Sequence, residues 1–265
     1  MSTFFEKIND LDILLHCDGY EREYFFAECS RLAYKGQKLA SKEFKKVGFT
    51  SYKFCSVEGA QCHIVKNRDY IVIAFRGTEP RQFSDIKADL MAWKRKSRTE
   101  GHVHAGFKNE LDKLWADIKM GLSRKGDRTI FLCGHSLGGA IATVCASRLE
   151  KDVEELYTYG SPRVGGDIFR DNLLVDHCRV VNNNDMVAKV PFWLMGYRHH
   201  GHLTYINHYG NIRELTSWQK LKDQIRGRWC ALRNFQMFDG IRDHDINKYC
   251  KKLKSLVKIE PTFGE

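Results

Sequence analysis

The sequence feature that most constrains this fold is a Gly-His-Ser-Leu-Gly segment at residues 134–138. Residues 129–133, before it, are mainly apolar and typical of a buried strand, whereas residues 140–146, after it, are rich in Ala and typical of a helix. A chain that passes so abruptly from strand to helix must turn sharply, and the turn holds its central residue, Ser136, in strained backbone angles. Glycines at both ends of the segment avoid the clashes that side chains would cause there.

The strand, turn and helix also indicate a role for Ser136. Its hydroxyl would project at the carboxyl end of the strand, above a helix N-terminus whose free N–H groups favour developing negative charge. That is the structural context of a serine nucleophile. A glycine-rich helix start with a buried serine is the alternative, but the apolar strand before the segment favours catalysis.

Strand-like and helix-like segments alternate through the middle of the 265-residue chain. This alternation predicts an α/β fold with a mostly parallel central sheet flanked by helices. Four Pro and the lack of low-complexity or repeated segments argue against a linker, so we expect one domain over residues 1–265. Apolar periodicity predicts helices at 22–35, 107–122 and 246–257, strands within 51–76 and at 156–159 and 178–181, a hairpin-like pair around 203–206 and 212–215, and a basic helix near 217–230.

The net charge of +10, from 43 Lys and Arg against 33 Asp and Glu, suits an anionic partner such as a membrane surface or nucleic acid. Ordinary solubility explains the same excess. We find no aromatic and basic RNA-binding motif, so we expect an anionic lipid surface and no nucleic acid partner. An apolar fraction of 43% and an aromatic fraction of 12% exclude a disordered chain.

The nine cysteines are an odd number, and several fall within apolar runs, which indicates buried free thiols in a reducing compartment. Cys55 and Cys62 flank a predicted hairpin, so one disulfide between them is an open alternative. Residues 1–18 lack the basic and apolar regions of a secretory signal, and no run is long enough to span a bilayer. We therefore expect a cytoplasmic location or a peripheral membrane one.

A serine nucleophile needs a base at neutral pH, and the base needs an acid that orients it. Asp185 follows the apolar strand at 178–181, so its carboxylate would emerge at the same sheet edge as Ser136. An Asx turn or a helix cap is the structural alternative for Asp185. A strand-to-helix turn that carries a nucleophile is called a nucleophile elbow, and in enzymes built on one the base follows the acid along the chain. Spacing leaves five histidines open, of which only the last directly precedes the apolar-faced final helix: His199, His200, His202, His208 and His244.

Residues 80–98 form an amphipathic, basic segment directly after the strand that ends in Arg76-Gly77-Thr78. Such a segment suits a mobile lid or a membrane-facing surface. A helix buried on one face, with a solvated basic rim, gives the same pattern. Its apolar residues recur at helical spacing, at Phe83, Ile86, Leu90 and Trp93.

Six motifs, in order along the chain, resemble the class 3 lipases, the fungal-type triacylglycerol lipase family of the α/β-hydrolase superfamily. They span roughly residues 25–215, and six ordered motifs are far more specific than one pentapeptide. The motifs are Ala74-Phe75-Arg76-Gly77-Thr78, Asp89-Leu90, Val103-His104-Ala105-Gly106-Phe107, Gly134-His135-Ser136-Leu137-Gly138-Gly139, Thr158-Tyr159-Gly160-Ser161-Pro162-Arg163-Val164-Gly165, and Asn184-Asp185-Met186-Val187 with Pro191 behind it.

The resemblance implies an α/β-hydrolase fold and a catalytic triad of Ser136, Asp185 and His244. His244 is chosen because Asp243-His244, followed by Tyr249, is similar to the family's late histidine segment. The family also carries a non-catalytic histidine in a Gly-Tyr-x-His segment, which His199 matches.

The resemblance further implies an oxyanion hole and a lid. The backbone N–H of Leu137 is a donor that any nucleophile elbow supplies. Thr78, on the loop after the Phe-Arg-Gly strand, is the second donor by resemblance alone. The family's lid follows this loop directly, which places residues 80–98 over the site.

We therefore expect a serine hydrolase that cleaves carboxylic esters of lipids through an acyl-enzyme on Ser136, with acylglycerols as substrates and phospholipids as a further class. The alternatives are a soluble carboxylesterase or acyltransferase with the same triad, and a non-catalytic lipid-binding module. No cofactor or metal is expected, because His199, His200 and His202 lack Cys or carboxylate neighbours at zinc spacing.

Overall fold

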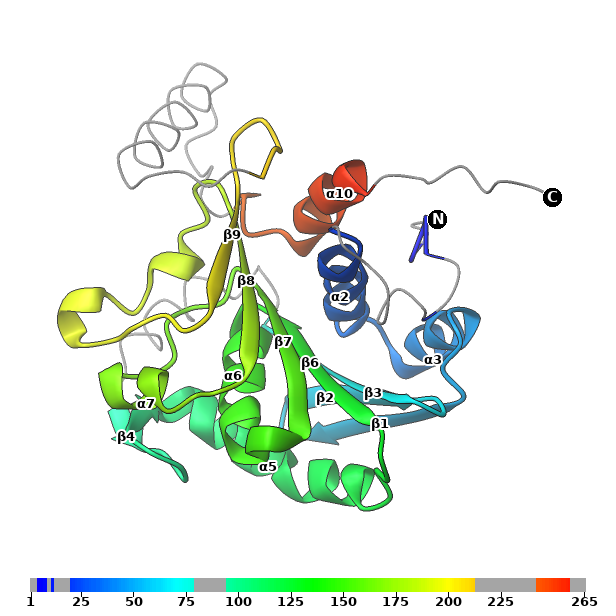
Figure 1. The fold of residues 1–265 in the computed structure, drawn as a ribbon, viewed down its shortest axis with the longest axis horizontal. Helices are drawn as coiled ribbons and strands as arrows, with labels where there is room; N and C mark the ends of the chain where they lie inside the picture. The colour runs from blue at the N-terminus through cyan, green and yellow to red at the C-terminus, as the bar shows by residue number, and fades with distance from the viewer. Residues whose placement is uncertain (1–3, 9–10, 12–19, 79–93, 213–241, 258–265) are drawn as a thin grey trace.

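A seven-stranded sheet in the order β1-β2-β3-β6-β7-β8-β9 organises the chain (Figure 1). The structure is a computed structural model that describes residues 4–8, 11, 20–78, 94–212 and 242–257. β1, β2 and β3 pair antiparallel, whereas every pairing from β3 to β9 is parallel, which confirms the predicted mostly parallel sheet. The strands are β1 (Ser51–Val57), β2 (Ala60–Lys66), β3 (Tyr70–Phe75), β6 (Thr129–His135), β7 (Val153–Tyr159), β8 (Asp176–Asn182) and β9 (His202–Ile206).

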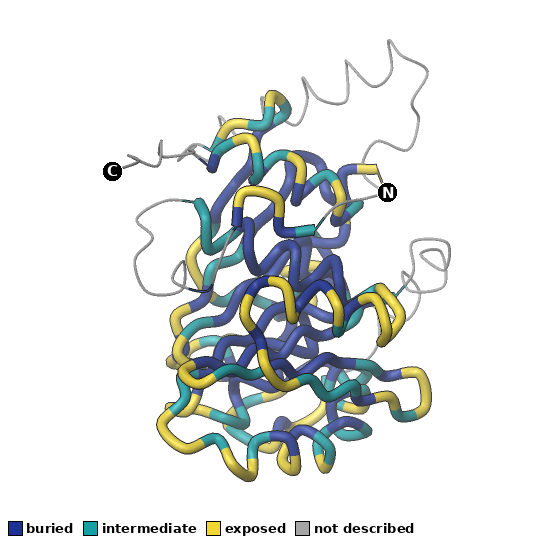
Figure 2. Tube along the Cα trace, turned by 90° about the vertical axis from the view of Figure 1, so that its right-hand side faces the viewer, coloured by how far each residue is buried: buried dark blue, intermediate teal, exposed yellow. Residues whose placement is uncertain are grey.

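Helices cover both faces of this sheet, and the buried residues lie in the interior of the molecule (Figure 2). Side chains of α2, α3 and α10 pack with one set of alternating strand positions, and those of α5 and α6 pack with the other set. Because both faces of β3 are covered, all six of its residues are buried and apolar. The helices are α2 (Glu21–Leu32), α3 (Gln37–Lys46), α5 (Ala105–Leu122), α6 (Leu137–Leu149), α7 (Asp167–Asp171) and α10 (Ile246–Leu256).

Most predicted elements are present. The predicted helices at 22–35, 107–122 and 246–257 correspond to α2, α5 and α10, and the predicted strands correspond to β1 to β3, β6, β7 and β8. The first half of the hairpin-like pair predicted around 203–206 and 212–215 is β9, which pairs parallel with β8. Of its second half, Ile212 forms one antiparallel bridge with Ile206. Residues 213–215 and the basic helix near 217–230 lie outside the described residues.

The candidate lid is described only at its end, because residues 80–93 lie outside the described part. There, β4 (Lys94–Lys96) pairs antiparallel with β5 (His102–His104) in a separate two-stranded sheet. The sequence did not predict this hairpin, since three consecutive cations have low strand propensity. Pairing with β5 therefore outweighs the local preference.

The seven described cysteines are free thiols, and Cys55 lies directly opposite Cys62 in the register of β1 and β2. Among the described residues, we find no helix whose length and apolar character would let it cross a bilayer.

Aromatic side chains pack α2 against the sheet. The ring of Phe26 lies 4.2 Å from the ring of Tyr157 on β7 and 5.4 Å from that of Phe131 on β6, and Phe26 is completely buried. Removing the ring would leave a cavity between helix and sheet. Phe26→Ala should therefore lower the free energy of unfolding by about 3–5 kcal/mol.

Urea unfolding followed by circular dichroism measures this change. Leu39→Ala, on the exposed side of α3, is the control, because Leu39 is 42% exposed and should change stability by less than about 0.5 kcal/mol. Equal losses in the two variants would contradict the assignment of Phe26 to the core.

Candidate active site

The turn between β6 and α6 holds Ser136 in a strained conformation. Its backbone angles are φ 59° and ψ −130°, a combination that residues with a side chain rarely adopt. The Ser136 N–H donates to the Tyr159 carbonyl at 2.9 Å, which ties the turn to β7. A Cβ added at Gly138 would lie 2.8 Å from the Arg76 carbonyl carbon, and one at Gly134 would lie 2.7 Å from the Gly139 nitrogen. Glycine is therefore required at both positions.

Asp185 and His244 meet beside this turn. Asp185 follows the carboxyl end of β8, and His244 lies just before α10. Both are buried, with exposed fractions of 0% and 3%. His244 Nδ1 lies 3.0 Å from Asp185 Oδ1 and 2.9 Å from Oδ2. Because an ionised carboxylate only accepts hydrogen bonds, Nδ1–H donates and Nε2 carries the lone pair of a base.

Two further donors fix the Asp185 carboxylate. The hydroxyl of Tyr249, on α10, donates to Oδ2 at 2.5 Å, and the backbone N–H of Val187 donates to Oδ1 at 2.9 Å. Burial, and next the Asp185 charge, raise the pKa of Tyr249 well above its usual value, so the hydroxyl keeps its proton. The sequence predicted Tyr249 only as part of an apolar helix face and of the family's late segment, and its contact with Asp185 is new.

His135 connects the serine turn to the histidine loop. Its Nε2–H donates to the His244 carbonyl at 2.7 Å, and its Nδ1 accepts the Tyr34 hydroxyl at 2.8 Å. The rings of His135 and His244 are 4.4 Å apart. Burial lowers the pKa of His135 well below its usual value, and His244 adds to this, so the ring is neutral. Since His135 precedes Ser136, this contact holds Ser136 and His244 in the same corner of the fold.

The polar end of β8 holds the loop from the other side. The side-chain amide of Asn182 donates to the Asp243 carbonyl at 2.8 Å. The carboxylate of Asp243 accepts the side-chain amide of Asn183 at 3.0 Å and the backbone N–H of Asn184 at 3.3 Å. Sequence pattern alone gives this asparagine run no role in the site. Its role is to place His244 next to Asp185.

Gly160, at the end of β7, makes room for the pair. It has a φ of 55°, and a Cβ there would lie 2.9 Å from His244 Nδ1 and 3.0 Å from the Tyr249 hydroxyl. Any larger residue would therefore push His244 and Tyr249 away from Asp185.

The predicted oxyanion donors lie on both sides of Ser136. A Cβ added at Gly77 would lie 3.2 Å from the Cβ of Ser136, so the loop after β3 passes directly beside the serine and carries Thr78 with it. Leu137 is the first residue of α6, where backbone N–H groups have no partner within the helix. An anion formed next to Ser136 Oγ would therefore face a helix N-terminus and this loop.

The other candidate histidines occupy different places. His199 Nε2 donates to the Ala188 carbonyl at 2.7 Å, and His200 stacks on His177 with ring centroids 5.3 Å apart. His202 is exposed at the start of β9, and the His208 ring lies 5.3 Å from that of Tyr209. Among the described histidines, His244 is the one that contacts Asp185.

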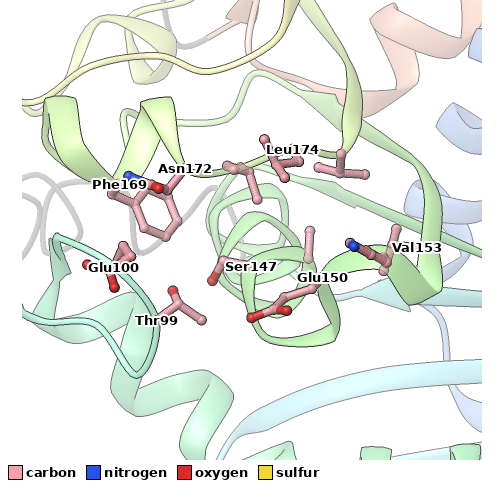
Figure 3. Close-up of a pocket in the computed structure, with 12 residues that line it drawn as sticks. Thr99, Glu100, Ser147, Glu150, Val153, Phe169, Asn172 and Leu174 are labelled. Carbon is pink, nitrogen blue, oxygen red and sulfur yellow. The ribbon is translucent and has the colours of Figure 1, made fainter.

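One cavity lies away from this site. It has a volume of about 310 Å³ and is lined by residues such as Ser147, Val153 and Phe169 (Figure 3). These residues surround the C-terminal end of α6, whereas Ser136 lies at its N-terminal end. This cavity is therefore separate from the candidate active site.

Comparisons with known proteins relate this chain to lipases. Residues 72–195 match the family described as Lipase (class 3). The chain is 42% identical over 106 residues to secreted mono- and diacylglycerol lipase 1 of Fusarium solani, which covers 37% of this chain and 32% of that protein. It is 30% identical over 151 residues to secreted mono- and diacylglycerol lipase MDL2 of Malassezia globosa, which covers 52% of this chain and 48% of that protein.

A solved triacylglyceride lipase of Rhizomucor miehei has the same fold, with a TM-score of 0.64 at 20% sequence identity over 84% of this chain and 91% of that one. The chain thus spans less than half the length of the two curated relatives, with 32% and 48% of them covered.

The buried imidazoles predict a loss of stability in acid. Burial lowers the pKa of His63 from 6.5 to about 4, and burial also lowers the pKa values of His135 and His177 well below the usual value. At these three histidines, the folded protein therefore binds fewer protons than the unfolded chain below pH 6.5. Its free energy of unfolding should fall as pH is lowered, by about 1.4 kcal/mol per pH unit for His63 alone between pH 6.5 and about 4.

Urea unfolding at a series of pH values measures this slope. His63→Gln should make the slope shallower, whereas His202→Gln, at an exposed position, should leave it unchanged. A stability that does not depend on pH in this range would contradict the neutral, buried state of these rings.

Proposed function

We propose that this chain is a class 3 lipase, a serine hydrolase that cleaves carboxylic esters of lipids through an acyl-enzyme on Ser136. The match of residues 72–195 to that family supports the proposal. The observation that carries the proposal is the contact of His244 with the buried Asp185 carboxylate at 2.9 Å, next to a serine at a strained strand-to-helix turn. Mono- and diacylglycerols are the first substrates to test, because the names of two relatives specify them. Phospholipids are the second class.

In the proposed mechanism, His244 Nε2 removes the proton of Ser136 as Oγ attacks the ester carbonyl carbon. Asp185 holds the ring in place and stabilises the imidazolium that forms. The tetrahedral oxyanion accepts hydrogen bonds from the N–H groups of Leu137 and Thr78. His244 then protonates the leaving alcohol, and a water molecule, deprotonated by the same ring, releases the fatty acid.

The proposal includes a lid and contact with a lipid interface. Residues 80–98 would cover Ser136 as part of a single domain over residues 1–265. The described end of this segment presents two exposed cations, Arg95 and Lys96. Each Lys or Arg near an anionic surface contributes about 1 kcal/mol, so a chain of net charge +10 should bind such surfaces peripherally.

Ser136→Ala tests the nucleophile. The variant should lose about 10⁴-fold or more of the hydrolysis rate on a short-chain p-nitrophenyl ester, and it should not react with a fluorophosphonate probe. Activity at the wild-type level would remove the assignment of Ser136 and leave a non-catalytic lipid-binding protein as the better account.

A pair of histidine variants tests the base. His244→Ala should reduce kcat by about 10⁴-fold, because no other described histidine contacts Asp185. His199→Ala is the matched control: it removes a ring that bonds to Ala188, so catalysis should persist. An inactive His199 variant beside an active His244 variant would reverse the choice of base.

A further inference from the structure

An exposed apolar turn follows the catalytic aspartate. Of the ten large hydrophobic residues that are exposed in the described part of the chain, five fall within residues 186–195. The exposed fractions are 61% for Trp193 and 78% for Leu194, and lower for the other three, Met186, Phe192 and Met195. Apolar side chains gathered in this way mark an interaction site, whereas single exposed ones need no explanation. We name residues 192–195 the apolar turn.

The apolar turn lies in the connection from β8 to β9, which reaches the left margin of the described fold in Figure 1. β8 brings Asp185 to the carboxyl edge of the sheet, and Met186 follows it immediately. Arg163, which follows the carboxyl end of β7, donates its backbone N–H to the Val190 carbonyl at 2.8 Å, two residues before the apolar turn. Because Ser136 lies at the carboxyl end of the neighbouring β6, a surface that contacts the apolar turn lies near the edge of the sheet that carries the candidate active site.

The apolar turn is held in its outward position by cations. The guanidinium of Arg198 donates to the Trp193 carbonyl at 2.9 Å, and Lys94 Nζ donates to the Gly196 carbonyl at 2.8 Å. Gly196 ends the 3-10 turn Trp193–Met195 with a left-handed φ of 73°. These bonds fix the backbone while leaving Trp193 and Leu194 in solvent. A fixed turn loses little conformational entropy when it binds.

The contact of Lys94 also brings β4 next to the apolar turn, and β4 carries two further exposed cations, Arg95 and Lys96. Arg198 additionally pairs with Asp167 at 3.0 Å, so part of its charge is balanced. A tryptophan-bearing apolar tip beside Lys and Arg matches the boundary of a lipid layer, where indole rings and cations both concentrate and where anionic headgroups attract the cations.

We infer that the apolar turn inserts into the surface of an anionic lipid layer, with Arg95 and Lys96 on the adjacent headgroups. This inference deepens the proposed lipid hydrolase function, since it names the surface through which the Ser136 site meets its substrate layer. The residues to which we assign docking all belong to the described part of the chain and lie outside residues 80–93 of the candidate lid.

Vesicle binding tests the inference in the Ser136→Ala background, so that no lipid is hydrolysed during the measurement. The vesicles contain equal parts of phosphatidylcholine and phosphatidylglycerol, and binding is measured by cosedimentation. Trp193→Ala combined with Leu194→Ser should weaken binding at least tenfold. Arg95→Gln combined with Lys96→Gln should weaken binding to these vesicles but leave binding to pure phosphatidylcholine vesicles unchanged.

Met120→Ser is the matched control, because Met120 is 62% exposed, like Trp193, but lies at the opposite edge of the sheet. The carbonyl of Gly121, next to Met120, accepts a hydrogen bond from Lys66 Nζ at the end of β2. Because β2 is antiparallel to β3, it ends at the edge where β3 begins, away from the carboxyl ends of the parallel strands. The control should bind vesicles as its parent does, and thermal unfolding midpoints show that each variant is folded.

Three results would overturn the inference: a parent that does not bind the vesicles, a turn variant that binds as tightly as its parent, and an equal loss in the Met120 variant. Fluorophosphonate labelling of Ser136 in the otherwise unchanged chain reports separately on the proposed catalysis. The failure of docking and the failure of the hydrolase proposal are therefore distinguishable.

Discussion

The buried carboxylate of Asp185 is the interaction on which the rest of the site depends. A carboxylate with no exposed surface is costly unless donors surround it, and three donors do so here: His244, Tyr249 and the backbone of Val187. Tyr249 and His244 belong to the C-terminal part of the chain, so satisfying this one charge docks α10 and the loop before it against β8. The requirement that stabilises the fold therefore also orients the candidate base.

Parallel strands explain why distant residues meet at this charge. β3, β6, β7 and β8 are parallel neighbours, so their carboxyl ends form one edge and bring Thr78, Ser136, Gly160 and Asp185 together. The packing is tight enough that Gly138 and Gly160 tolerate no side chain. His135 then joins the serine turn to the C-terminal loop through the His244 carbonyl.

The parts of the site that depend on local pattern could be predicted from the sequence. The turn at Ser136 follows from neighbouring residues, and Asp185 follows from its place after a strand. His244 could not be separated from four other histidines by spacing, because its contact with Asp185 spans 59 residues and depends on how α10 docks. The Tyr249 and His135 contacts were missed for the same reason, and the β4 hairpin was missed because pairing outweighs the poor strand propensity of Lys-Arg-Lys.

The role of Asp185 can be measured by the rate at which a fluorophosphonate modifies Ser136 in an Asp185→Asn variant. The amide preserves the size of the side chain but removes the charge that fixes the His244 tautomer and stabilises the imidazolium. We expect phosphonylation to slow by about 10⁴-fold while the protein stays folded. A folded variant labelled within a few-fold of the wild-type rate would show that Asp185 does not orient the base, and the assignment of the triad would be wrong.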